Sequence, residues 1–463
     1  MSARSLGSSP PHPVVDQAGE AGPAAWRRTR RNLLVAGSAA GGALLAACGP
    51  AGGAGAPAET KTRQPVTLRS WILQPGVPEP NDATEAAFAA IKEKYPHITV
   101  VDEGKGRANQ EYVDAVTTAT VSGTLPDMLY AQGPQIQGFI RIGAVRALDD
   151  FLARDKAFDV KDFPDVALKV YQAGGKQFAI PYDHGPHLLW FNKTLFEKEG
   201  VKPPDATWTM NDMVEAARRL TKATEGQWGT NFAPSGGYPL QATWLGPWGG
   251  KLLNDAETEI YIDSKEAIEA LEFWYDLRVK RRLSPMPGES VDWWQGKLAM
   301  KNTGPWDYRG HLARKPDFVA DIADWPKGPR GRAASSMGSG YPISSQSKHA
   351  EDAWLWLSEY LGKDDNRSLL SQFVKTGKGT PVRYSLLARW EKSEFAPPSA
   401  KIVAPALKEY SVVGRPITPI QGDLNKIIND ALNAVWAGQM SVPQAVRQIK
   451  QLAQPLLEQN KGK

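Results

Sequence analysis

The chain has 463 residues, a formal net charge of +5 at pH 7 and a single cysteine. Five arginines and two acidic residues lie before residue 48, so the rest of the chain carries about +2 and, apart from the short VKRR at 279–282, has no basic run. This balance argues against a strongly basic nucleic-acid-binding protein, and about 400 residues beyond the N-terminal region predict two lobes rather than one core.

The first 47 residues have the order of an export signal, with a basic start, an apolar middle and a small-residue end. Four arginines between residues 27 and 31 precede a Gly- and Ala-rich run at 33–47. This run is shorter than the roughly 20 apolar residues that span a bilayer. The segment TRRNLL at 29–34 resembles a twin-arginine export signal, with Sec export as the alternative.

The only cysteine, Cys48, ends the segment LAAC at 45–48, which resembles a bacterial lipobox. We therefore expect residues 1–47 to be removed and Cys48 to carry lipid, which would anchor the exported protein to the outer face of the plasma membrane. A plain signal peptide with a free cysteine is the alternative. Use of Cys48 for lipid leaves no thiol for a disulfide or for catalysis. Residues 48–64 are rich in Gly, Ala and Pro and predict a flexible tether.

Strand-like and helix-like segments alternate beyond the tether, which is the pattern of an α/β fold. Runs of β-branched and apolar residues predict strands at 66–73, 97–101 and 125–131. Apolar residues at helical spacing predict helices at 82–96 and 109–123. Asp82 and Glu85 have the spacing of a capping box, so we expect the first helix to begin at Asp82.

The same alternation continues through the second half of the chain. Strands are predicted at 175–183 and 187–196, and a strand followed by a turn at 296–308. The predicted helices are 207–221, 262–277, 350–361, 422–438 and 441–459. The expected N-terminal caps among these helices are Thr209 with Asp212, Asp263 with Glu266, and Ser441.

Six segments, in a fixed order, carry a resemblance to a known family. They are FAAIKEKYPHITV, GTLPDMLYA, GKQFAIPYD, LLWFNKTLFEKEGVKPPDATWTMNDMVEAARRL, WQGKLAMKNTGPW and KHAEDAWLWLSEYL. Behind a lipobox, they resemble the carbohydrate-binding lipoproteins of bacterial ABC importers, the group around maltose-binding protein. The resemblance extends from residue 66 to the C-terminus.

The resemblance implies a two-lobe, periplasmic-binding-protein-like α/β fold with the ligand in a cleft between the lobes. The implied N-terminal lobe is 65–182 with 327–374, and the implied C-terminal lobe is 183–326 with 375–463. Lobes of this kind close on the ligand about a hinge, for which Pro181 and Pro326 are candidates. The implied partners are a sugar or oligosaccharide and the permease subunits of an ABC transporter. The resemblance also implies a monomer without catalysis, cofactor or metal.

A sugar has polar edges and apolar faces, so its site needs flat aromatic rings beside planar hydrogen-bonding groups. In α/β sheets such groups lie where the chain leaves the carboxyl ends of the strands. Residues at such positions or in loops rich in small residues are Gln132, Tyr182, Asp183, Trp244, Trp248, Asp307, Ser339, Tyr341 and Arg383. The resemblance adds Trp71, in a loop that the family uses for ligand, and Trp306, where the family stacks an aromatic ring on sugar.

Structural alternatives remain open at several of these positions. The alternative for Trp71 is a buried strand residue, and for Arg383 it is a salt bridge. Trp293 and Trp294 are compatible with either a pocket or a core. Four tryptophans at core spacing on predicted helices are expected to be structural, namely Trp208, Trp274, Trp354 and Trp356.

The sequence contains only weak indications of a metal site or of catalytic residues. His184 and His187 flank a Gly-Pro pair, but zinc needs a third ligand and Pro186 prevents a helix that would align them, so no metal site is expected. The sequence has no G-x-S-x-G elbow and no P-loop. One alternative keeps the fold and changes the cargo to glycerol phosphate, a polyamine or a peptide. Another is a secreted carbohydrate-active enzyme with an acid pair such as Asp149 and Asp150.

Overall fold

The computed structural model describes residues 64–74, 78–107, 109–237, 239–254, 258–363, 367–377, 379–413 and 420–460. The expected export signal, Cys48 and nearly all of the expected tether lie outside these residues. Helices and strands of both sheet types alternate along the described part, which confirms the predicted α/β class. None of the helices in these residues is both long and apolar enough to cross a bilayer.

A three-stranded parallel sheet forms around β1 (Val66–Trp71), which pairs with β2 (Ile98–Asp102) and β3 (Met128–Leu129). The connecting helices are α1 (Pro78–Lys94) and α2 (Gln110–Ser122). Asn109 caps α2 by accepting the backbone N–H of Tyr112, and Gly123 ends the helix at a φ of 69°, where glycine is favoured. The strands and helices agree with the predictions, but α1 already begins at Pro78. The cap expected at Asp82 is therefore wrong.

The first core cluster joins this sheet to helices that lie much later in the chain. Its buried residues run from Leu68 to Tyr182 and then from Tyr341 to Leu386. The second stretch contributes α10 (Ala350–Ser358) and α11 (Leu369–Thr376). Because burial of apolar surface is the main stabilising term, the two distant stretches depend on each other for folding.

A second sheet has the strand order β11–β8–β10–β9. Its strands are β8 (Leu188–Asn192), β9 (Trp228–Thr230), β10 (Leu298–Thr303) and β11 (Ala320–Ala323). The segment predicted as a strand at 187–196 turns into a helix halfway, because the side chain of Asn192 accepts the N–H of Leu195 and caps α6 (Lys193–Lys198). Strand β8 is buried on both faces, with Leu189 and Leu188 in different core clusters.

The second core cluster covers one face of this sheet with helices from two stretches of the chain, 189–334 and 420–457. These helices are α7 (Met210–Leu220), α8 (Lys265–Tyr275), α14 (Gln421–Trp436) and α15 (Val442–Gln459). The predicted caps Thr209 with Asp212 and Ser441 are confirmed. The expected cap of α8 is wrong by one residue, since Ser264 accepts the N–H of Ala267 and Asp263 instead binds Lys450.

A third cluster packs β8 and β10 against α12 (Tyr384–Trp390) and α13 (Val403–Glu409). The four tryptophans expected to be structural are all buried, Trp208 and Trp274 in the second cluster and Trp354 and Trp356 in the first. Trp293 is also buried in the third cluster, whereas Trp294 packs at its edge. The chain between β11 and the C-terminus therefore contributes to all three clusters.

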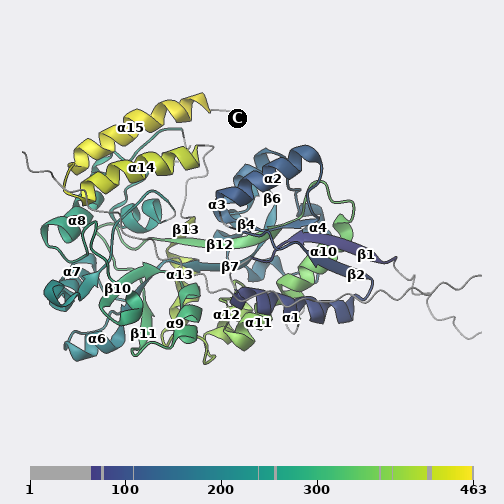
Figure 1. Cartoon of the computed structure of the whole chain (residues 1–463), viewed down its shortest axis with the longest axis horizontal. Coiled ribbons are helices and arrows are strands. Elements are labelled where there is room, and N and C mark those ends of the chain that lie inside the picture. The colour runs from purple at the N-terminus through teal and green to yellow at the C-terminus, as the bar shows by residue number, and fades with distance from the viewer. Residues whose placement is uncertain are drawn as a thin grey trace, which may run out of the picture. The chain divides into compact units, whose positions relative to one another are not determined.

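Two long antiparallel strands connect the clusters. Strand β7 (Ala179–Pro186) pairs with β12 (Ala334–Pro342), with a register shift between Ser339 and Gly340. Figure 1 shows the two strands side by side between the sheet of β1 and β2 and the sheet that contains β10 and β11. At one end Tyr182 and Tyr341 belong to the first cluster, and at the other end Ala334 belongs to the second. The residues of β7 and β12 are therefore positioned between the two cores by their mutual pairing.

Close approach of these strands requires glycine at position 338. A Cβ atom there would lie 2.0 Å from the backbone oxygen of Asp183. Gly338→Ala is expected to lower the free energy of unfolding by about 1–3 kcal/mol, because relief of the clash must move backbone. Urea denaturation measures the change. The matched control is Gly138→Ala in α3 (Gly133–Arg141), where a Cβ meets nothing within 4 Å. Equal stability of the two variants would contradict this account.

Candidate functional site

The centre of the candidate site is the point where three strands meet. Ser339 of β12 pairs with Gln132 of β4 (Ala131–Gln132) on one side and with Asp183 of β7 on the other. The carboxylate of Asp183 accepts the backbone N–H of Ser339 at 2.6 Å, and the Ser339 hydroxyl lies 2.8 Å from the hydroxyl of Tyr130. Three of the residues expected to meet ligand are thus brought together by backbone pairing.

An aromatic pair lies next to this meeting point. The rings of Tyr182 and Tyr341 stack with centroids 4.6 Å apart and planes 13° apart. Gln74 donates from Nε2 to the Tyr182 hydroxyl at 3.2 Å. Burial raises the pKa of both phenols well above the ordinary value, so both stay protonated. The two tyrosine rings are stacked on each other and buried, so little of either ring surface is open.

Asp183 is a buried carboxyl whose pKa is shifted by its surroundings. Burial raises the pKa of its carboxyl to about 6, while the N–H of Ser339 and the guanidinium of Arg309 act in the opposite direction. Arg309 lies on α9 (Tyr308–Arg314), and none of the hydrogen bonds or ion pairs found in the described residues involves it. Asp183 and Arg309 together give the site a near-balanced charge at neutral pH.

Trp306 lies beside β7 and keeps part of its ring exposed. It follows β10 in a single turn of 3₁₀ helix at Pro305–Asp307. A Cβ on Gly185 would lie 2.8 Å from Pro305 and 3.4 Å from the Trp306 ring, so the turn packs directly on β7. The Trp306 ring makes an edge contact with His187 at 5.5 Å between centroids. Trp306 is thus the aromatic residue among those expected that remains partly open, and it lies beside Gly185 of β7.

The carboxylate of Asp307 already has a cationic partner within the protein. Its carboxylate binds Lys301 Nζ at 2.8 Å, and Lys301 also lies over the rings of Trp190, Trp293 and Trp294 at about 5 Å. This ion pair holds the turn that carries Trp306. The geometry therefore gives Asp307 a positioning role rather than an open hydrogen-bonding group.

Trp71 lies at the end of β1 and is 4% exposed. Its indole N–H donates to Glu103 at 2.7 Å, and Lys105 Nζ lies 4.7 Å from the ring centre. One edge of the ring contacts Tyr112. These contacts agree with the alternative of a buried strand residue.

Trp244 and Trp248 lie inside the second core cluster, in a helical segment after β9. The Trp244 ring packs against the rings of Trp274 and Trp325, and Trp248 packs against Phe273. Both side chains are less than 10% exposed. An open stacking platform in this segment does not fit the structure, because other aromatic rings already cover both indoles.

Arg383 also has internal partners. Its guanidinium binds Asp162 at 2.8 Å and the backbone oxygen of Gly362. The structure thus agrees with the salt-bridge alternative, because both partners of the guanidinium lie within the protein. Arg309, which sequence patterns did not single out, is the arginine that lies near Asp183.

His184 and His187 are both buried, and burial determines their charge. His187 lies 2.8 Å from Asn302 Oδ1 and burial lowers its pKa to about 4, while burial lowers the pKa of His184 to about 3. Neither imidazole is cationic at neutral pH. In the described part of the chain, no three His, Cys, Asp or Glu residues are grouped to hold a metal ion. His187 contributes to the site as a neutral neighbour of Trp306.

Asp183→Asn is expected to stabilise the protein more at about pH 8 than at about pH 4. The folded-state pKa of about 6 lies above the ordinary value of 3.8, so the carboxylate destabilises the fold above pH 6, and this penalty disappears as pH falls toward 4. Asparagine keeps an acceptor oxygen for the N–H of Ser339 without the charge. Urea unfolding of both proteins at both pH values measures the difference, and an identical difference at the two pH values would contradict the raised pKa.

Comparison with known proteins agrees with this architecture. The model of the family described as bacterial extracellular solute-binding protein matches residues 77–367. A binding protein of Brucella abortus is 25% identical over 270 residues, 56% of this chain and 63% of that protein, so the chain spans less than two thirds of this relative. The arabinooligosaccharide-binding protein of Bacillus subtilis is 22% identical over 273 residues, 56% of this chain and 61% of that protein.

The fold is also similar to that of experimentally solved binding-protein structures. The ABC substrate-binding protein of Listeria monocytogenes in complex with cycloalternan superposes with a TM-score of 0.74 at 20% identity. The match covers 85% of this chain and all of that one. This likeness confirms the two-lobe, periplasmic-binding-protein-like fold.

Proposed function

Because the chain belongs to the family of bacterial extracellular solute-binding proteins, we propose that it captures a sugar or oligosaccharide for an ABC transporter. The observation that carries this proposal is the partly open Trp306 ring packed against β7, the strand that also bears Asp183. An apolar ring face beside planar hydrogen-bonding groups is the arrangement that a sugar needs. The ligands of two similar proteins, arabinooligosaccharides and cycloalternan, support the same ligand class.

The proposed mechanism is closure of two lobes about β7 and β12. The lobes are 65–182 with 327–374 and 183–326 with 375–463. The strand pair supports a division into two lobes, because its two ends enter different core clusters. Ligand that contacts both lobes would favour the closed state by its differential affinity. The protein then delivers its cargo to a membrane permease as a monomer and performs no chemistry of its own.

Thermal-shift measurements on the full chain test the ligand class. The panel contains mono- and oligosaccharides, glycerol phosphates, polyamines and short peptides, because a ligand that binds only the folded state raises the melting temperature. A large shift with a saccharide is the expected result. A shift with a phosphate, amine or peptide alone would replace the sugar by that cargo. Conversion of the saccharide into a product would favour an enzyme instead.

Trp306→Ala is expected to weaken binding of the saccharide found in this screen by about ten-fold or more, because ring stacking contributes at least about 1.4 kcal/mol. Isothermal titration calorimetry measures the change. Trp294→Ala is the matched control, since this partly exposed indole is already covered by Arg314 and Lys301. Unchanged affinity in Trp306→Ala would remove Trp306 from the site.

We also propose that the protein is exported and held by lipid at Cys48. This rests on the sequence alone, through the LAAC segment and the basic, apolar run before it. Cys48→Ala is expected to shift the protein from the membrane fraction to the soluble fraction of the producing cells, because the attachment atom is lost. Retention of the variant in the membrane fraction would contradict the lipid anchor.

A further inference from the structure

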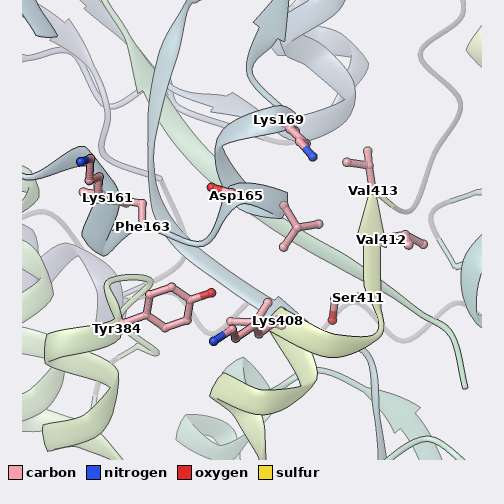
Figure 2. A pocket seen from close by; sticks show the side chains of 11 residues that line it. Lys161, Phe163, Asp165, Lys169, Tyr384, Lys408, Ser411, Val412 and Val413 are labelled. Carbon is pink, nitrogen blue, oxygen red and sulfur yellow. The ribbon is translucent and has the colours of Figure 1, made fainter. Parts of the chain in front are cut away.

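A concave surface that shares no residue with the candidate sugar site lies beside the paired strands β7 and β12. It is a groove of about 580 Å³ between α5 (Asp165–Lys169), α12, α13 and β13 (Ser411–Val413), which we call the α5–α13 groove. Figure 2 shows its lining side chains. They are Lys161, Phe163, Asp165, Val166, Lys169, Tyr384, Leu407, Lys408, Ser411, Val412 and Val413. None of them belongs to the candidate sugar site.

The groove has an excess of positive charge. Three lysines line it, Lys161, Lys169 and Lys408, against one carboxylate, Asp165. Among the residues that the structure describes, these three lysines take part in none of the ion pairs. In Figure 2, Lys169 and Lys408 come from opposite walls, and Lys408 extends toward the Tyr384 hydroxyl. Two cations and a phenol donor therefore face one open volume.

The remaining lining is apolar. Phe163 and Leu407 are buried at its base, and Val412 is 45% exposed, one of the more exposed large apolar residues in the described chain. A volume of this size falls within the ~300–1,000 Å³ typical of small-molecule sites, which combine apolar walls with a few polar groups. The groove thus combines apolar lining residues with cationic groups.

We propose that the α5–α13 groove binds a small organic anion, a phosphomonoester or carboxylate attached to an apolar body. The ammonium groups of Lys169 and Lys408 contact the anionic group, and the Tyr384 hydroxyl donates a further hydrogen bond. The apolar body packs on Val412 and Leu407. Uncharged molecules of the same shape bind more weakly, because they leave the lysine charges unpaired.

The walls of the groove belong to different core clusters, which gives the bound anion a structural effect. Phe163 is part of the first cluster, and Leu407 of α13 is part of the third. A ligand that contacts both walls holds the two clusters together. Binding is therefore expected to raise the melting temperature of the full chain by mass action.

Phenyl phosphate is a suitable probe, with inorganic phosphate and phenol as partial probes. Isothermal titration calorimetry and thermal shift on the full chain are expected to show saturable binding of phenyl phosphate. Binding should weaken several-fold when salt is raised from about 0.05 to 0.5 M, because exposed charges are screened. Inorganic phosphate is expected to bind more weakly than phenyl phosphate, and phenol should not bind measurably. Equal binding of the two phosphates would overturn the apolar part of the site.

A double variant that removes two lysine charges from the groove, compared with a control variant outside it, tests where the anion binds. Lys169→Gln with Lys408→Gln is expected to weaken phenyl phosphate binding at least ten-fold, and both side chains are exposed, so folding should be unaffected. Lys348→Gln is the matched control, an exposed lysine on the first lobe that does not line the groove. Unchanged affinity in the double variant, or no binding to the unaltered chain, would overturn the proposal. Saccharide binding by the same double variant should stay unchanged, which separates this site from the proposed sugar site.

Discussion

The antiparallel pairing of β7 with β12 is the constraint on which the candidate site depends. These strands enter the first core cluster at Tyr182 and Tyr341 and the second at Ala334, so they are at once part of both cores and the connection between them. Such a connection needs small residues, because large side chains on both faces of the strands would pack against both cores and join them into one. Gly338 and Gly340 answer this need, since a Cβ on either would clash with atoms of β7 or with Tyr171.

The same thin connection explains the electrostatics of Asp183. A strand between two cores has little water around it, and that environment raises the pKa of a carboxyl unless hydrogen bonds compensate. Here the N–H of Ser339 and the charge of Arg309 compensate only in part. A carboxyl kept in such a place costs stability. A group of this kind is more often retained for recognition than for folding.

Local features of the fold could be read from the sequence, and features that depend on distant partners could not. The caps of α7 and α15 were predicted, because a cap needs only residues three apart in the chain. The cap of α8 shifted to Ser264, since Asp263 has a better partner in Lys450, which is distant in sequence. The start of α1 at Pro78 was missed for a local reason, because proline suits the first turn as well as an acidic cap does.

Within the site, the same limit applies to the residues expected to meet ligand. Gln132 was expected from its place at a strand end, Asp183 from the first crossing between the lobes and Ser339 from a loop of small residues. Backbone pairing brings the three together, and their contact with ligand stays a prediction. Trp244 was placed with them because glycines surround it, but four aromatic residues from elsewhere in the chain enclose it and its neighbour Trp248. A tryptophan among glycines has the same local sequence in a core and at a surface, so only tertiary contacts distinguish the two.

Charge pairing divides the polar groups of the molecule into two kinds. Asp307 with Lys301 and Arg383 with Asp162 are closed ion pairs, so neither pair leaves an unpaired charge for a ligand. Around Asp183 the opposite charge of Arg309 leaves a nearly neutral site, which suits an uncharged ligand such as a sugar. The α5–α13 groove has three cations against one carboxylate, which suits an anion. Because desolvating an unmatched charge is costly, we expect each surface to disfavour the class of ligand proposed for the other. The charge of a ligand would therefore determine which of the two surfaces it occupies.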